Sequence, residues 1–162
     1  MEWKHACVLV ILSAILRSLE AADAMRLLAA GFLSVMDDCK KDLNIDEGLI
    51  TDLYKYWKQD FSFLHRETGC AIICMSKKLD LLSEDRTIHH GNTKDFAMKN
   101  GASDDLASKM IGVIHSCETK SEGIEDECWR VLEVAKCFRV GIHALHWEPT
   151  ADVMLTEVLT EI

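Results

Sequence analysis

The sequence contains 162 residues, 49% of them hydrophobic, with eight glycines, one proline and a formal net charge of −9 at pH 7. A chain of this size and composition is expected to fold as a single compact domain with a core of ordinary size. The acidic charge excludes nucleic acid and anionic membrane surfaces as partners, because the sequence has no stripe of Lys and Arg to neutralise phosphates.

The first residues have the layout of a secretory signal peptide. Lys4 and His5 precede an apolar run at 6–16, and small residues follow at 21–24. The run is about half the length needed to span a bilayer. We therefore predict a signal peptide at 1–20, cleaved between residues 20 and 24, and a secreted domain at 21–162. A buried N-terminal helix is the alternative.

The early part of the domain is predicted to be helical. Residues 25–43 have apolar positions at helical spacing and are expected to form a helix broken or bent near Gly31, and a turn follows at 44–48. A short helix then covers 48–57. Its inward positions are Leu49, Leu53, Tyr56 and Trp57.

Residues 66–79 form the helix around which we expect the domain to be organised. Cys70 and Cys74 lie one turn apart and therefore share one face. The opposite face holds Ile72, Met75, Ser76 and Leu79. Our hypothesis is that this mostly apolar face, with its single hydroxyl, lines a ligand cavity.

The second half of the chain reads as further helices. A loop at 82–92 leads to Asn92, the predicted N-cap of a helix that stops at Gly101, and Ser103 caps the next helix. A charged turn precedes a long last helix that Pro149 ends. Residues 150–162 are again periodic, and strand-type alternation is absent. The predicted fold class is all-α, with six to seven helices.

Six cysteines remain once Cys7 is removed with the signal peptide. They are Cys39, Cys70, Cys74, Cys117, Cys128 and Cys137. An even number in an exported domain predicts three disulfides. Helix geometry argues only against a bond between the two cysteines at 70 and 74, so the connectivity stays open at this point.

Four segments carry a resemblance to a known family. They are FLSVMDDCKK, RETGCAIICMSKKL, IHHGNTKDFAMK and CFRVGIHALHWEPTADV. With the cysteine spacing, they resemble the insect odorant-binding proteins, specifically the moth pheromone-binding and general odorant-binding branch. The HHGN and HWEPTAD segments favour the pheromone-binding group within it.

This resemblance implies a compact bundle of six helices around a closed apolar cavity. It pairs Cys39 with Cys74, Cys70 with Cys128 and Cys117 with Cys137. It further implies an extracellular carrier, without cofactor, that takes long-chain alcohols, acetates and aldehydes through the sensillum lymph of the antenna. An olfactory receptor or another membrane protein of the neuron, and a second copy of the chain, are the macromolecular partners such a carrier would meet.

Ten residues are placed around the cavity by the resemblance. They are Phe32, Tyr56, Trp57, Ile72, Ser76, Leu82, Ile88, Phe96, Ile114 and Phe138. Phe32 and Phe138 are expected to sandwich an alkene, and Tyr56 adds a hydroxyl where the family suggests phenylalanine. Plain core packing is the alternative for the apolar members. Ser76 either binds a ligand head group or bonds back to the carbonyl of Ile72.

The resemblance also suggests an acid-sensitive switch. Ionised carboxylates of Asp152, Glu157 and Glu161 would keep the C-terminal tail, 150–162, outside the cavity at neutral pH, and the tail would enter in acid and displace ligand. Burial raises the pKa of a carboxylate, so docking takes up protons, which is the required sign. His89, His90 and His115 would charge in the same direction.

Other functions are less well supported. The sequence has no Gly-x-Ser-x-Gly elbow, no His-Glu-x-x-His motif and no phosphate-binding glycine loop, so we expect no enzyme. A secreted phospholipase would need a histidine next to paired cysteines with an aspartate partner, and His115 near Cys117 resembles this pattern only weakly. A saposin-like module would pair its outermost cysteines. His89 and His90 are adjacent rather than helically spaced, so no metal site is expected.

Overall fold

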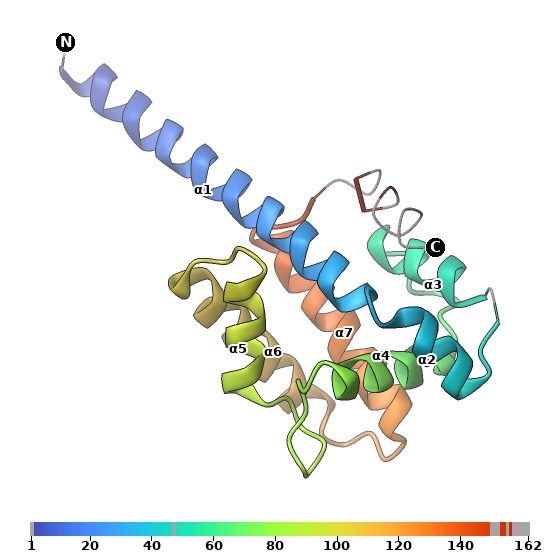
Figure 1. The fold of residues 1–162 in the computed structure, drawn as a ribbon. Helices are drawn as coiled ribbons and strands as arrows, with labels where there is room; N and C mark the ends of the chain where they lie inside the picture. Colours follow the sequence, from blue (N-terminus) through green and yellow to red (C-terminus); the bar gives the residue numbers. More distant parts are fainter. Residues whose placement is uncertain (1, 47, 150–152, 155, 157–162) are drawn as a thin grey trace.

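The computed structural model describes residues 2–46, 48–149, 153, 154 and 156, and this part of the chain forms a helical bundle (Figure 1). The helices are α1 (Glu2–Leu33), α2 (Met36–Leu43), α3 (Gly48–Trp57), α4 (Arg66–Lys78), α5 (His90–Lys99), α6 (Asp104–Ser121) and α7 (Glu127–Ala144). The only extended pairing in the described residues is a single bridge between Leu82 and Ile88. The all-α prediction is confirmed.

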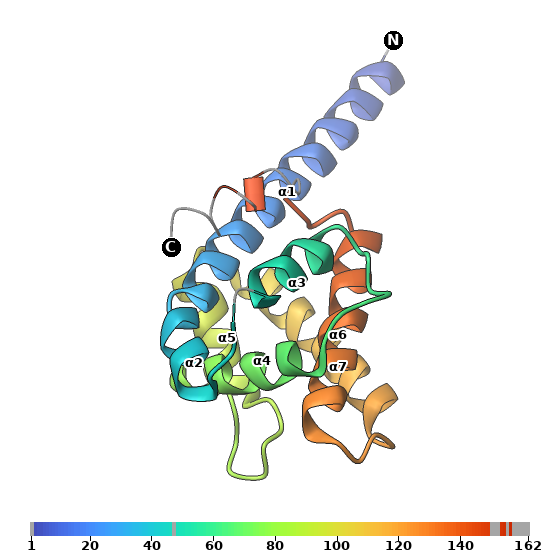
Figure 2. The ribbon, with the colours of Figure 1, turned by 90° about the vertical axis from the view of Figure 1, so that its right-hand side faces the viewer.

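Helix α1 projects from the bundle over its first half (Figures 1 and 2). Residues 5–17 are exposed, and burial begins at Ala21, which is 3% exposed. Within the described residues, one helix, near the N-terminus, is long and apolar enough to cross a membrane, and a signal sequence meets the same criteria. The onset of burial falls inside the interval predicted for cleavage.

The helix is interrupted slightly later in the chain than the position expected, near Gly31. Helix α1 continues to Leu33, and residues 34 and 35 separate it from α2. Gly31 is instead a point of close packing, because a Cβ there would lie 2.7 Å from Oδ1 of Asn100. The glycine therefore allows the C-terminal end of α5 to approach α1.

Helix α4 lies at the centre of the packing. It packs most extensively on α7 and also contacts α1, α2 and α3 (Figure 2). Gly69 permits the closest approach, since a Cβ at this position would lie 1.9 Å from the carbonyl oxygen of Cys128 on α7. The glycine in RETGC is therefore required by backbone packing between these two helices.

The N-cap of α5 differs from the expectation. Helix α5 begins at His90, and Nδ1 of His89 accepts a hydrogen bond from the backbone N–H of Asn92. Asn92 lies inside the first turn, and its side-chain amide donates to the carbonyl and carboxylate oxygens of Asp80. The prediction of Asn92 as N-cap is wrong, because a histidine ring nitrogen three residues earlier supplies the cap. Ser103 caps α6 as expected.

The last helix ends earlier than predicted. Helix α7 stops at Ala144, five residues before Pro149, and His146 has a positive φ of 55°. The chain reverses there, since the N–H of Trp147 donates to the carbonyl of Ile142. Trp147 is partly buried and packs on the core, Pro149 is buried, and Leu145 is exposed. The chain therefore turns back onto the core before it reaches the proline.

Two apolar clusters form the core. The α6 cluster joins α1, α5, α6 and α7, and Leu28, Trp57, Phe138 and Trp147 pack against it. The α4 cluster joins the end of α1 with α2, α3 and α4, and Phe32, Val35, Ile45, Ile50, Ile72 and Cys74 pack against it. Burial of these side chains supplies the main driving force for folding.

The three disulfides follow the pairing implied by the resemblance. Cys39 bonds to Cys74, Cys70 to Cys128 and Cys117 to Cys137, with Cα–Cα distances of 5.8, 4.7 and 5.6 Å. They connect α2 to α4, α4 to α7 and α7 to α6 in series. The outermost cysteines, Cys39 and Cys137, are not paired with each other, so the saposin-like alternative is wrong.

Candidate ligand-binding site and its histidine cluster

Ser76 is a buried hydroxyl on α4. The residue is 4% exposed. Its two expected roles, a bond to a ligand head group and a bond back to the carbonyl of Ile72, both stay predictions. Burial of a hydroxyl costs free energy unless the hydroxyl forms a hydrogen bond. Ile72 lies beside it on the same helix and packs against the α4 cluster.

The aromatic residues of α3 form a connected group. The rings of Tyr56 and Trp57 meet edge to face at 5.6 Å, and Phe61 lies 6.2 Å from Tyr56. The Tyr56 hydroxyl donates to the carbonyl of Ala135 on α7 at 3.0 Å, and burial raises its pKa. The extra hydroxyl is thus used to join α3 to α7, which leaves it only as an acceptor for a ligand.

The other expected cavity residues lie on separate elements, and all are partly buried. Phe32 packs against the α4 cluster, whereas Phe138 packs against the α6 cluster. Leu82 and Ile88 face each other across the loop before α5. Phe96 lies on α5 and Ile114 on α6. Their roles as ligand contacts stay predictions.

A buried carboxylate on α3 was not found from the sequence. Asp52 is 1% exposed, and it accepts hydrogen bonds from the hydroxyl of Thr68 at 2.6 Å and from the backbone N–H of His65 at 2.7 Å. Burial alone would raise its pKa, but the bonds from Thr68 and His65 outweigh burial, and the pKa is lowered. This network holds α3 against the beginning of α4.

A second network precedes the C-terminal tail. Arg139 on α7 is 4% exposed, donates to the carbonyl of Trp57 at 2.6 Å and forms an ion pair with Glu148. Glu148 also pairs with His143. Burial would raise the Glu148 pKa, but the hydrogen bonds with His143 and Arg139 lower it. The segment after α7 is therefore anchored on the bundle just before the tail.

The structure describes little of the tail itself. Met154 is 1% exposed, whereas Val153 and Thr156 are exposed. Asp152, Glu157 and Glu161 lie outside the described residues. Their predicted part in an acid switch stays untested by the geometry.

Of the three histidines expected to take part in the acid-sensitive switch, His90 and His115 lie next to each other, and His89 is not in contact with this pair through any ring contact that the structure shows. The rings of His90 and His115 meet edge to face at 5.5 Å, and Nε2 of His90 lies 3.6 Å from Oε2 of Glu118. His89 is exposed and caps α5. Glu118 was not singled out from the sequence, although its spacing from His115 places both on one face of a helix.

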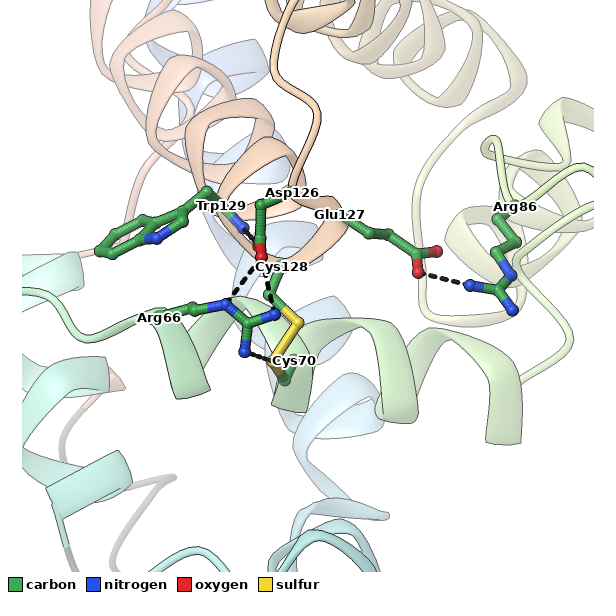
Figure 3. The surroundings of a disulfide bond; sticks show 7 residues. All are labelled: Arg66, Cys70, Arg86, Asp126, Glu127, Cys128 and Trp129. Atoms are coloured by element: carbon green, nitrogen blue, oxygen red, sulfur yellow. Dashed lines mark hydrogen bonds and ion pairs between the residues drawn. A yellow bond between two sulfur atoms is a disulfide. The ribbon is translucent and has the colours of Figure 1, made fainter.

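The junction of α4 and α7 has its own polar contacts (Figure 3). Nε and Nη2 of Arg66 donate to Oδ2 of Asp126 at 2.9 and 2.8 Å, beside the bond between Cys70 and Cys128. Oδ1 of Asp126 accepts from the N–H of Trp129 and so caps α7. Asp126 therefore positions the start of α7 on α4.

Comparison with known proteins agrees with this architecture. The sequence profile of the PBP/GOBP family matches residues 21–140. Pheromone-binding protein 2 of Epiphyas postvittana is 41% identical over 140 residues, covering 86% of this chain and 85% of the relative. General odorant-binding protein 1 of Heliothis virescens is 34% identical over 153 residues, covering 94% and 93%. The crystal structure of pheromone-binding protein 3 of Epiphyas postvittana has a TM-score of 0.66 and 51% identity, covering 69% of this chain and 96% of that one.

Proposed function

The chain belongs to the PBP/GOBP family, and from that premise we propose that it is an extracellular carrier of small hydrophobic odorants, and of pheromone molecules in particular. It is not an enzyme, because its relatives are binding proteins. The observation that best supports a ligand site is the burial of Ser76, a polar residue, on α4 beside the apolar Ile72.

The apolar chain and the polar head group of a ligand contribute very different free energies to binding. Burying a sixteen-carbon chain yields on the order of 12 kcal/mol of gross transfer free energy, at about 0.8 kcal/mol per methylene. One hydrogen bond contributes about 1 kcal/mol. We therefore propose that the apolar residues supply the affinity and that Ser76 discriminates between head groups. Long-chain alcohols, acetates and aldehydes are the proposed ligands.

The pheromone-binding assignment is the finer part of the proposal. It is supported by the HHGN and HWEPTAD segments and by the 41% identity to a protein named as a pheromone-binding protein. A general odorant-binding protein with a broader range of ligands is the alternative, supported by 34% identity to a protein of that name.

Acid-dependent release is proposed from the charges near the tail. Asp152, Glu157 and Glu161 are ionised at neutral pH, and entry of the tail into the cavity would require their protonation, so acid favours displacement of ligand. His89, His90 and His115 lie at the start of α5 and on α6, and protonation there would add positive charge as the pH falls. The buried Met154 supports contact between the tail and the bundle.

Secretion into the sensillum lymph is the proposed location. It is supported by the exposed apolar start of α1 and by the three disulfides, which form in oxidising compartments. An acidic surface keeps such a carrier soluble.

A displaceable fluorescent lipid probe tests the carrier function. Protein secreted by insect cells should bind the probe, and a sixteen-carbon alcohol should displace it stoichiometrically. A water-soluble short alcohol is the control and should not compete. Failure of the long alcohol to displace bound probe, or absence of probe binding by disulfide-bonded protein, would refute the carrier function.

A further inference from the structure

Two histidines and a glutamate from distant parts of the sequence meet where α5 begins beside α6. His90 is the first residue of α5, and His115 and Glu118 lie one turn apart on α6. One potential ligand atom from each side chain lies within 4.8 Å of the other two. The adjacent pair His89 and His90 gives no sign of this group in the sequence, because the other two potential ligands, His115 and Glu118, lie on a different helix.

We propose that His90, His115 and Glu118 bind a divalent transition-metal ion of the Zn²⁺ type. Two imidazole nitrogens and one carboxylate oxygen are a donor set that suits such ions, and three protein ligands leave a further coordination position for solvent. His90 and His115 are the same residues to which we assigned a part in acid-dependent release. Zn²⁺ binding is measured directly, however, so its failure is distinguishable from failure of the carrier function.

The distance between the ligand atoms of His90 and Glu118 is close to the distance between two ligand atoms of a bound ion. Ligand atoms about 2.1 Å from a tetrahedral ion lie about 3.4 Å from one another. The atoms of His90 and Glu118 are already at 3.6 Å. The side chain of His90 is 48% exposed and His115 is also exposed, so both rings have room to rotate toward a bound ion.

The carboxylate is held in place by the backbone. Oε1 of Glu118 accepts a hydrogen bond from the N–H of Ile88 at 3.0 Å, which leaves Oε2 directed to His90. Support of this kind orients a metal ligand before the ion arrives. A bound ion would tie the loop before α5, the first turn of α5 and α6 together.

Zinc titration of the secreted, metal-free protein tests the site. A chromophoric zinc chelator as competitor reports the affinity at slightly alkaline pH, where protons compete less with a metal ion for its ligands. His90→Gln and His115→Gln should each weaken Zn²⁺ binding about tenfold or more, and Glu118→Gln should act in the same direction while keeping an acceptor for Ile88. Mg²⁺ should not compete, because it prefers oxygen ligands.

His89→Asn is the matched control. It removes the neighbouring exposed histidine but keeps a side chain that can cap α5, so zinc affinity should be unchanged. Circular dichroism and probe binding check that each variant is folded. The proposal is overturned if the protein binds no Zn²⁺, if His90→Gln and His115→Gln bind as tightly as the parent, or if His89→Asn weakens binding equally.

Discussion

At the scale of single residues, Asp52 and Ser76 are two buried polar groups of this helical bundle. Asp52 has its hydrogen bonds supplied by the protein, from Thr68 and His65. That arrangement stabilises the fold, whereas the role that we propose for Ser76 is to bind the head group of a ligand.

Ser76→Ala should therefore change ligand preference rather than stability. Loss of one hydrogen bond of about 1 kcal/mol corresponds to about a fivefold loss of affinity for a long-chain alcohol. A hydrocarbon of the same length should be unaffected. Competitive displacement of the fluorescent probe measures both ligands, and equal losses for the two would remove the role assigned to Ser76.

Asp52→Asn should lower the free energy of unfolding by about 2 kcal/mol at neutral pH, because hydrogen bonds to a charged, buried group are lost. The lowered pKa makes this contribution fully present above the unfolded-state pKa of about 3.9 and lost as pH falls through the folded-state pKa. Urea denaturation of both proteins measures the difference, which should shrink in acid. Asp60→Asn, at an exposed position, is the control and should have little effect; a similar loss there would contradict the argument.

At the scale of elements, the approach of α4 to α7 depends on one glycine. Gly69→Ala should destabilise the protein by about 3 kcal/mol or more, the upper end of the cost of overpacking, because the new methyl group would meet the Cys128 carbonyl. Gly112→Ala on α6 is the matched control, since nothing lies within 4 Å of a Cβ there. That change should stabilise the helix by about 0.5–1 kcal/mol. Thermal unfolding compares them, and equal effects would contradict the packing argument.

The C-terminal tail is a second element whose role can be isolated. Deletion of 151–162 keeps Glu148 and its ion pair with Arg139, so the bundle should remain folded. The full chain should release ligand at about pH 5, and the truncated protein should still hold it. Glu157→Gln combined with Glu161→Gln should instead raise the pH of release. Ligand release by the truncated protein in acid would refute the tail mechanism.

At the scale of the whole molecule, the bundle is separate from the exposed start of α1. Cys7 lies in this part and is unpaired. If the signal peptide is removed between residues 20 and 24, the protein secreted from insect cells should have no free thiol after denaturation. Mass spectrometry of the intact protein measures its N-terminus at the same time. A secreted chain that keeps Cys7 as a free thiol would show that cleavage does not occur there.

Much of this fold could be read from the sequence. Helical spacing of apolar residues predicted the order of the helices, and Ser103 was correctly identified as a cap, because these features depend on residues close in the chain. The disulfide pairing followed from the resemblance of the cysteine spacing to a known family. The cavity residues could be named in the same way, although their contact with ligand remains a prediction.

Only the tertiary structure decided the features that join distant segments. Helix α7 ends before Pro149, where the chain turns back and Trp147 packs on the core, and a ring nitrogen of His89 replaces Asn92 as the cap of α5. His90 meets His115 and Glu118 because α5 packs on α6. Local sequence patterns determine which segments are helical, but the neighbours of a side chain depend on how those helices pack, and no short-range pattern contains that information.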